Sequence, residues 1–246
     1  MLKAVCTVLL LGLSGQVIAD SLAVVVGAQS WQGRSDLALT DSVNQRHRTT
    51  DNDNLQAWYL KFEHPLPLLP NLAFKQQNLH HSSVLTLSTD FLFGAQKFLA
   101  AQPVTATLTG RWQDFSTYYE LADNDLLQLD LGLSIRRLDV SLTLQDPNNR
   151  VQQQIDRWRP MLFADAELAI LGTDTAIFGH VGYGKASNDH SRDISGGFAW
   201  RWLDITPLQG YLKIGYQDVT LDLSALNTTN TVPSVRGVFA ALEFDF

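Results

Sequence analysis

The sequence is poor in charge, in basic residues and in long apolar runs. Its 246 residues are 17% charged, against roughly 25% in soluble globular domains. The mean hydropathy is -0.04, and the sequence has no apolar run of the roughly 18 residues that a membrane-spanning helix needs. This excludes a bundle of transmembrane helices. Lys and Arg number 18 against 25 Asp and Glu, for a net charge of -7, which argues against a nucleic-acid partner because phosphate binding needs a basic surface.

The N-terminal residues have the pattern of a cleaved export signal. Lys3 supplies a small positive region, residues 4–13 form an apolar stretch, and Ala19 is the small residue that precedes a cleavage site. The apolar stretch is too short to span a bilayer, so a retained anchor helix is the weaker alternative. We expect cleavage between Ala19 and Asp20, which gives a signal peptide at 1–19 and one mature domain at 20–246.

Cysteine is nearly absent. Cys6 is the only one, and it would leave with the signal peptide. A lipoprotein is disfavoured because Cys6 lies near the start of the apolar stretch, where a lipidation cysteine would follow it. Exported proteins can form disulfides, so a chain without them must be held together in another way. A closed, hydrogen-bonded β-barrel would serve.

After the export signal, apolar residues recur with a period of two. In the segment 127–136, Leu127, Leu129, Leu131, Leu133 and Ile135 share one face, and polar residues and glycine occupy the other. The segment 238–246 alternates in the same way. Strands of about ten residues with this repeat are typical of transmembrane barrels. We therefore predict an all-β fold, a closed antiparallel transmembrane β-barrel of about ten strands.

The strands are expected near 22–32, 55–64, 72–79, 108–121, 126–138, 158–170, 175–185, 194–203, 210–221 and 235–246. Their connections alternate in length, as extracellular loops and periplasmic turns do. Long outer loops are expected at 33–54, 80–107, 139–157, 186–193 and 222–234. An even strand number would place both termini in the periplasm. The apolar phase changes between Ile135 and Leu138, which suggests a β-bulge at Arg136-Arg137 with the hairpin continuing above the membrane.

Aromatic residues cluster near the ends of the predicted strands, as in the girdles of membrane barrels. The predicted outer band holds Trp31, Trp112, Trp158 and Tyr183, and the periplasmic band holds Phe62, Tyr119, Trp202, Phe244 and Phe246. The alternative is that these rings form the core of a soluble β-sandwich. The chain ends on alternating Leu242, Phe244 and Phe246, which resemble the C-terminal signal read by the machinery that inserts outer-membrane barrels.

Three segments carry a wider resemblance. They are residues 63–71 (EHPLPLLPN), 118–124 (YYELADN) and 129–133 (LDLGL). Over most of its predicted mature length the chain resembles a family of uncharacterised Gram-negative outer-membrane β-barrel proteins. The resemblance implies the fold and a location in the cell outer membrane. It implies no activity and no catalytic or binding residues.

The predicted inward faces carry charged and polar side chains, which are expensive to place against lipid. The lumen-lining candidates are Lys61, Glu63, Lys75, Asp114, Glu120, Asp130, Arg136, Asp165, Glu167, His180, Arg201, Lys213, Glu243 and Asp245. Because eight strands leave an interior just filled by side chains, a ten-stranded lumen lies near the filled end. These residues could form a salt-bridged plug, or line a narrow path for small solutes with a weak preference for cations.

The sequence contains no specific catalytic, cofactor or metal motif. It lacks G-x-S-x-G, H-E-x-x-H and G-x-x-x-x-G-K. His47, His80, His81 and His190 lie near acidic or hydroxyl residues and could serve a rim hydrolase if their loops met. Adjacent His80 and His81 would point to opposite faces of an extended segment, which disfavours a shared metal.

We therefore expect an outer-membrane scaffold or narrow pore without catalysis, cofactor or metal. A surface-binding protein such as an adhesin or receptor is the first alternative, and a rim hydrolase acting on lipid or peptide is the second. The expected partners are outer-membrane lipid and, during biogenesis, periplasmic chaperones and the barrel insertion machinery. We expect a monomer.

Overall fold

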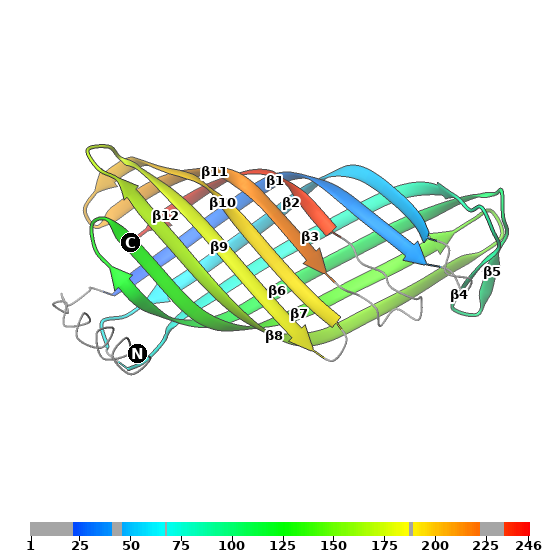
Figure 1. Cartoon of the computed structure of the whole chain (residues 1–246), viewed down its shortest axis with the longest axis horizontal. Helices are drawn as coiled ribbons and strands as arrows, with labels where there is room; N and C mark the ends of the chain where they lie inside the picture. Colours follow the sequence, from blue (N-terminus) through cyan, green and yellow to red (C-terminus); the bar gives the residue numbers. More distant parts are fainter. Residues whose placement is uncertain (1–21, 41–45, 67, 187–188, 222–233) are drawn as a thin grey trace, which may run out of the picture.

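The protein is a closed antiparallel β-barrel. The computed structural model describes residues 22–40, 46–66, 68–186, 189–221 and 234–246. In this part of the chain the regular elements are all strands, and ten of them close the barrel in the order β1-β12-β11-β10-β9-β8-β7-β6-β3-β2 (Figure 1). No helix among these residues is long and apolar enough to cross a membrane. The predicted fold class and strand number are confirmed.

The barrel strands are longer than the sequence pattern suggested. They are β1 (Ala23–Thr40), β2 (Arg46–Glu63), β3 (Asn71–Thr86), β6 (Pro103–Asp123), β7 (Leu127–Gln145), β8 (Arg150–Ile170), β9 (Thr175–Ala186), β10 (Asp189–Ile205), β11 (Leu208–Leu221) and β12 (Ser234–Asp245). A small hairpin, β4 (Phe91–Phe93) and β5 (Gln96–Phe98), was not predicted. The expectation of long loops at 33–54, 80–107, 139–157 and 186–193 is wrong, because the described parts of these segments are mostly strand. The expected loop at 222–234 lies almost wholly outside the described residues.

The two ends of the barrel differ. One end, here called the turn end, holds the short connections 64–70, 124–126, 171–174 and 206–207. The first and last strands also meet there, where Val25 pairs with Asp245. The other end, here called the extended end, carries the β4–β5 hairpin. Figure 1 shows β3, β6, β7 and β8 running past the ends of β9 to β12 toward that hairpin.

Strand polarity inverts partway along the barrel. On β7, Leu131, Leu133 and Ile135 are exposed on the outer surface. Further toward the extended end the apolar residues of β7 point inward, and Leu138, Val140, Leu142 and Leu144 are fully buried. The β7 pairing with both neighbours continues through Arg136 and Arg137 without a shift, so the predicted bulge there is wrong. The side-chain parity is constant, and the apolar residues change face instead.

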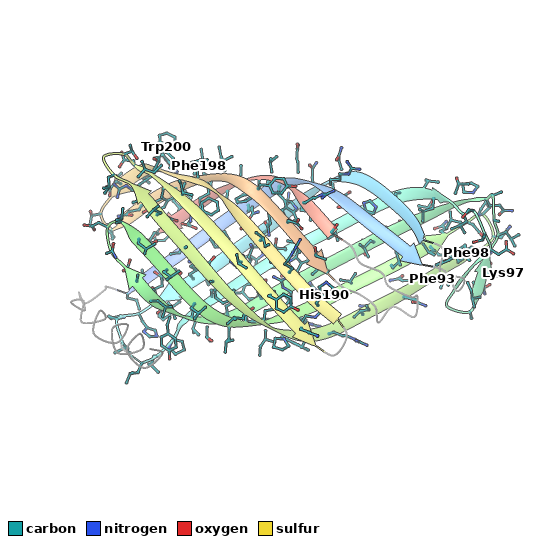
Figure 2. The ribbon with its side chains drawn as sticks, viewed as in Figure 1. Phe93, Lys97, Phe98, His190, Phe198 and Trp200 are labelled. Carbon is teal, nitrogen blue, oxygen red and sulfur yellow. The ribbon has the colours of Figure 1, made fainter. Side chains whose placement is uncertain are left out.

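The outer surface near the turn end is an apolar band. Exposed leucine, isoleucine, valine and aromatic side chains occur on every barrel strand, among them Val26, Leu60, Leu72, Phe115, Leu133, Leu162, Ile177, Phe198, Ile214 and Val238. Figure 2 shows Phe198 and Trp200 pointing away from the barrel near the turn end. A continuous band of this kind is expensive in water and suits lipid. The barrel is therefore built to span a membrane.

Aromatic rings mark the edge of this band. A chain of outward rings crosses β2, β3, β6 and β8, formed by Trp58, Phe74, Phe115 and Trp158 with successive centroids 5.0, 4.9 and 6.0 Å apart. Trp158 and Tyr183 are exposed, as an interfacial girdle requires. Trp31 and Trp112 are buried instead. Their assignment to the outer girdle is wrong because they lie beyond the point where the strands invert.

The extended part packs as two facing sheets. The β2–β3 register runs from Phe62↔Leu72 only to Gln56↔Asn78. The β8–β9 register runs from Ile170↔Thr175 only to Leu162↔Tyr183. Beyond these points β3, β6, β7 and β8 form one sheet and the remaining strands the other, with the apolar core between them. The β-sandwich alternative is therefore correct only for the core beyond the apolar band, and the rest of the protein is a membrane barrel.

Candidate functional site: the polar lumen and its closure

Within the apolar band, the lumen is polar. It contains a cavity of about 300 Å³ at the turn end and a second of about 210 Å³ toward the middle. Both cavities are lined by Lys61, Asp130, Glu167, Lys213 and Glu243, so they are neighbouring compartments of one space. This space is the candidate functional site of the lumen.

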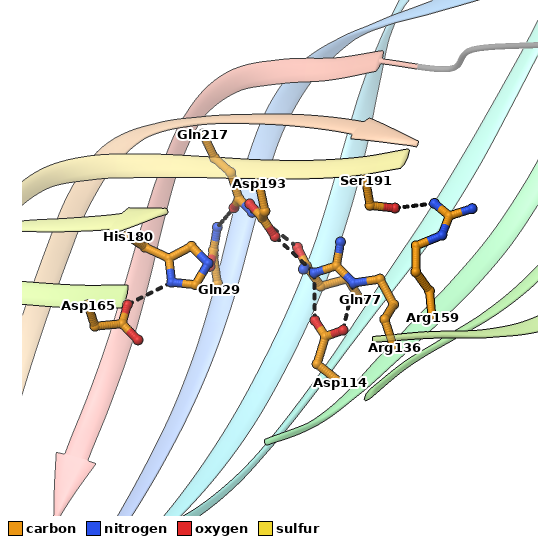
Figure 3. Close-up of polar contacts among 10 residues, drawn as sticks. All are labelled: Gln29, Gln77, Asp114, Arg136, Arg159, Asp165, His180, Ser191, Asp193 and Gln217. Atoms are coloured by element: carbon orange, nitrogen blue, oxygen red, sulfur yellow. Dashed lines mark hydrogen bonds and ion pairs between the residues drawn. The ribbon is translucent and has the colours of Figure 1, made fainter. Parts of the chain in front are cut away.

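A buried cluster around Arg136 forms the wall of the inner cavity that faces the extended end (Figure 3). Arg136 donates from Nε to Asp114 Oδ1 at 2.6 Å and from Nη2 to Asp114 Oδ2 at 2.8 Å. The same Nη2 donates to Asp193 Oδ2 at 3.1 Å. Asp193 also accepts from Gln217, which accepts from Gln29. The bidentate arrangement is the strong form of an arginine–carboxylate contact, and it joins β6, β7 and β10 across the lumen.

A second network lies nearer the turn end. Lys213 Nζ lies 2.8 Å from Glu243 and 3.6 Å from Glu167. Tyr59 donates to Glu243 at 2.6 Å. Tyr59 reaches this position by lying across Gly27, where a Cβ atom would come within 2.1 Å of its ring. Gly27 therefore makes room for the tyrosine.

A histidine–aspartate pair also faces the cavity. His180 Nδ1 lies 2.7 Å from Asp165 Oδ1, between β9 and β8 (Figure 3). Paired carboxylate and imidazole groups can exchange protons with a bound solute. Both residues line the inner cavity, so the pair is placed to contact a polar solute there.

An apolar core closes the lumen beyond the arginine cluster. It includes Trp31, Leu55, Leu79, Trp112, Leu142 and Val219, drawn from strands of both sheets. Phe91, Phe93 and Phe98 of the β4–β5 hairpin belong to the same core. Figure 2 shows Phe93 and Phe98 at the extended end of the barrel.

The hairpin is fastened by Asp90. Its carboxylate lies 2.7 Å from Lys97 Nζ and accepts from the Ala100 backbone N–H at 2.9 Å. The hydrogen bond from Lys97, and then that from Ala100, holds the pKa of Asp90 below its usual value. The carboxylate is therefore charged at neutral pH and holds the hairpin over the core.

Most of the predicted lumen residues border these cavities. Those that line the inner cavity are Lys61, Lys75, Asp114, Asp130, Arg136, Asp165, Glu167, His180, Lys213 and Glu243. Glu63, Glu120 and Asp245 line the cavity at the turn end. Arg201 lies apart from both cavities. It occupies the end of β10, where it pairs with Asp174 at 2.9 Å and Asp204 at 3.6 Å.

Several lumen residues were missed by sequence reasoning. They are Gln29, Tyr59, Gln77, Arg159, Asp193 and Gln217. Alternation could have found four of them, because they share strand parity with inward residues predicted on the same strand: Tyr59, Gln77, Arg159 and Gln217. It could not find Gln29, since no inward residue was predicted on that strand, or Asp193, which was assigned to a loop. Arg159 contacts Ser191 Oγ and donates to the His190 carbonyl oxygen at 3.0 Å across the seam between β8 and β10.

The rim histidines do not gather into one site among the described residues. His81 is buried and lies 2.8 Å from Asp53 across the β2–β3 seam. His80 lies on the opposite face of β3, as the alternation predicted. The neighbour of His190, Ser191, contacts Arg159. The side chain of His47 lies outside the described residues, and no metal-binding group of three ligands occurs among the rest.

Two solved structures share this architecture. The outer membrane protease OmpT from Escherichia coli matches with a TM-score of 0.53 and 8% identity, over 93% of this chain and 97% of that one. The transport unit of the autotransporter AIDA-I from Escherichia coli matches with a TM-score of 0.52 and 9% identity, over 99% and 97%. No protein-family model and no curated protein sequence matches. At such low identity the likeness concerns the fold alone, and by that fold and its apolar band the chain is a β-barrel of the Gram-negative outer-membrane type.

Proposed function

We propose that the protein is a non-conducting outer-membrane scaffold that carries a rigid β-structure beyond the lipid for surface binding. The observation that supports this most strongly is the inversion of strand polarity, which fills the lumen of the extended part with apolar side chains. This proposal combines the expected scaffold with the surface-binding alternative. In this proposal the binding surface is formed by the β-strands that continue beyond the lipid, and not by long loops.

The apolar core opposes a through-path. Leu108, Trp112, Leu142 and Leu144 are at most 1% exposed, and an ion crossing this layer would lose its hydration without compensating ligands. The cavities stop on the turn side of the arginine cluster, since their lining includes Arg136 and Asp114 but none of those four residues. The narrow-pore reading therefore has less support than the plugged one.

The barrel orientation follows from the same asymmetry. The short turns, the start of β1 and the end of β12 all lie at the turn end. In barrels of this type, the end with the short turns faces the periplasm. The extended end then lies outside the cell. The polar lumen opens toward the periplasm.

Purified protein in planar lipid bilayers is expected to give no conductance steps. The physical reason is the dry core between the inner cavity and the extended end. A general porin, reconstituted in the same way, is the positive control. Reproducible steps from the wild-type protein would contradict the closed lumen.

Thiol labelling tests closure and orientation together. In a Cys6→Ser background, we expect a Ser116→Cys thiol to react with a membrane-impermeant maleimide only after the outer membrane is permeabilised, because Ser116 lines the inner cavity. A Gln96→Cys thiol, exposed on the β4–β5 hairpin, is expected to react in intact cells. Labelling of Ser116→Cys in intact cells would refute closure, and a protected Gln96→Cys would refute the orientation.

The remaining interactions follow from the barrel. The apolar band binds outer-membrane lipid, and a monomer suffices to bury the core. Leu242 and Phe246 point outward on the last strand, and Phe244 packs edge-on against Trp202 at 6.1 Å. This pattern suits recognition by the barrel insertion machinery. We propose no catalytic role, because the described residues bring together no nucleophile, base and orienting acid.

A further inference from the structure

We propose that the outward face of β3, β6, β7 and β8, just beyond the apolar band, binds the uncharged sugars of glycolipid head groups in the surrounding leaflet. The proposal rests on the proposed orientation and names a partner class for it. The face is defined by two rows of side chains, here called the hydroxyl–amide face. They are Ser82, Thr107, Thr143 and Gln152, and His80, Thr109, Ser141 and Gln154.

The rows follow directly from strand register. Ser82 pairs with Thr107, Thr107 with Thr143, and Thr143 with Gln152. The second row is built in the same way two residues closer to the membrane. No bulge interrupts the β6–β7 or β7–β8 pairing in these rows. The alternate residues of the same strands, such as Ala106, Leu108 and Leu142, are buried in the core, so the face is held rigid from behind.

The chemistry of the face is that of an uncharged polyol partner. Hydroxyl groups both donate and accept hydrogen bonds, and a glutamine amide offers two donors and an acceptor. Two contacts already order the hydroxyls, Ser82 Oγ with Thr107 Oγ1 at 3.2 Å and Thr109 Oγ1 with Ser141 Oγ at 2.7 Å. Exposed sheet surfaces are usually kept soluble by Lys and Glu. These two rows carry neither.

On the membrane side of the two rows, the charged groups of this face neutralise one another, and on the outer side the next row carries one exposed charged residue, Arg150. Arg137 is bidentate to Asp156 at 3.0 and 2.7 Å. Arg111 lies 3.4 Å from Asp139, which also accepts from Gln154. A phosphate group could bind Arg137 or Arg111 only by displacing the aspartate that each arginine already contacts. The two rows contain no Lys or Arg, so they favour sugar hydroxyls over anionic groups.

The position of the face selects the source of the sugar. Phe115 and Trp158 mark the edge of the lipid band, with their ring centroids 6.0 Å apart, and the charged pairs lie next to them at head-group level. The nearer row begins four residues beyond Trp158 on β8 and six residues beyond Phe115 on β6, roughly 14–20 Å along strands that rise about 3.4 Å per residue. Because barrel strands tilt by about 35–45°, this is roughly 10–17 Å along the membrane normal. A phospholipid head-group layer is only about 5–8 Å thick, so it ends below these rows. A glycolipid carrying several sugars reaches them.

The test uses the full protein folded in phosphatidylcholine vesicles, with or without a lipopolysaccharide that retains its core sugars. The face is altered by Thr107→Val, Thr109→Val, Ser141→Ala and Thr143→Val, which remove hydroxyls while keeping side-chain shape. A matched control removes hydroxyls from the other sheet by Thr220→Val and Ser234→Ala. The measurement is glycolipid binding by fluorescence titration, with thermal unfolding in plain vesicles to verify that each variant is folded. Two further arms use lipid A without core sugars and a free neutral oligosaccharide.

We expect the core-sugar lipopolysaccharide to bind wild type and the control equally, and to bind the four-fold variant at least tenfold more weakly. We also expect weaker binding of lipid A. Equal affinity of the four-fold variant and wild type would overturn the proposal. So would equal affinity for lipid A, which would point to phosphate or acyl contacts, or tight binding of the free oligosaccharide, which would point to a soluble glycan. A reversed orientation would show in the thiol labelling, independently of this titration.

Discussion

Replacing Arg136 with methionine is expected to lower the free energy of unfolding by about 3–5 kcal/mol, the cost of breaking a buried ion pair from one side. Arg136 is 2% exposed, and the two acidic residues that it holds, Asp114 and Asp193, are buried as well. Without the guanidinium, two buried acidic groups would face each other. The measurement is urea-induced unfolding of the vesicle-bound barrel, followed by tryptophan fluorescence.

The neighbouring residue provides the control. Arg137 pairs with Asp156 on the outer face, where solvent screens the interaction and such exposed pairs contribute little to stability. Arg137→Met should therefore change stability little. A triple variant, Arg136→Met with Asp114→Asn and Asp193→Asn, leaves none of these three charges in the cluster and should be more stable than Arg136→Met alone. Similar losses for Arg136→Met and Arg137→Met would show that the cluster does not join the lumen walls.

Leu142→Ala is expected to cost about 2–5 kcal/mol, because it opens a cavity in a packed apolar core. Leu142 is fully buried between the two sheets of the extended part. Had 139–157 been a solvated loop, the same change would have had almost no effect. The same unfolding measurement applies.

Thr143→Ala is the matched control for Leu142→Ala. Thr143 adjoins Leu142 on β7 but faces outward, and surface substitutions usually change stability by less than about 0.5 kcal/mol. A large loss for Leu142→Ala with a small one for Thr143→Ala would verify the side-chain parity beyond the membrane. The reverse result would mean that the strand is shifted by one residue.

The local pattern was sufficient to predict the barrel. Alternation along β7 and β12, and the count of such segments, required strands with one apolar and one polar face. This holds because side-chain direction in a strand is a local property with a period of two. Most predicted inward residues, from Lys61 to Glu243, border the lumen cavities for the same reason.

The pattern was insufficient where the environment of the strand changes. The apolar shift between Ile135 and Leu138 has two explanations, a change of register or a change of surroundings, and alternation alone cannot separate them. Because β7 pairs with β6 and β8 without a shift at this point, the surroundings of the strand change and its register does not. The same ambiguity misplaced Trp31 and Trp112, since a buried core ring and a girdle ring have the same spacing in sequence.

The sequence by itself determined that the chain forms a barrel with a polar lumen, a lipid-facing band and no specific catalytic motif. Only the tertiary structure decided that Arg136 joins Asp114 to Asp193 across the lumen, that the extended part is closed by an apolar core, and that four strands align eight polar side chains, none of them Lys, Arg, Asp or Glu, in two rows. These features depend on contacts between strands far apart in the chain. Such contacts are fixed by register and closure, which no single strand encodes.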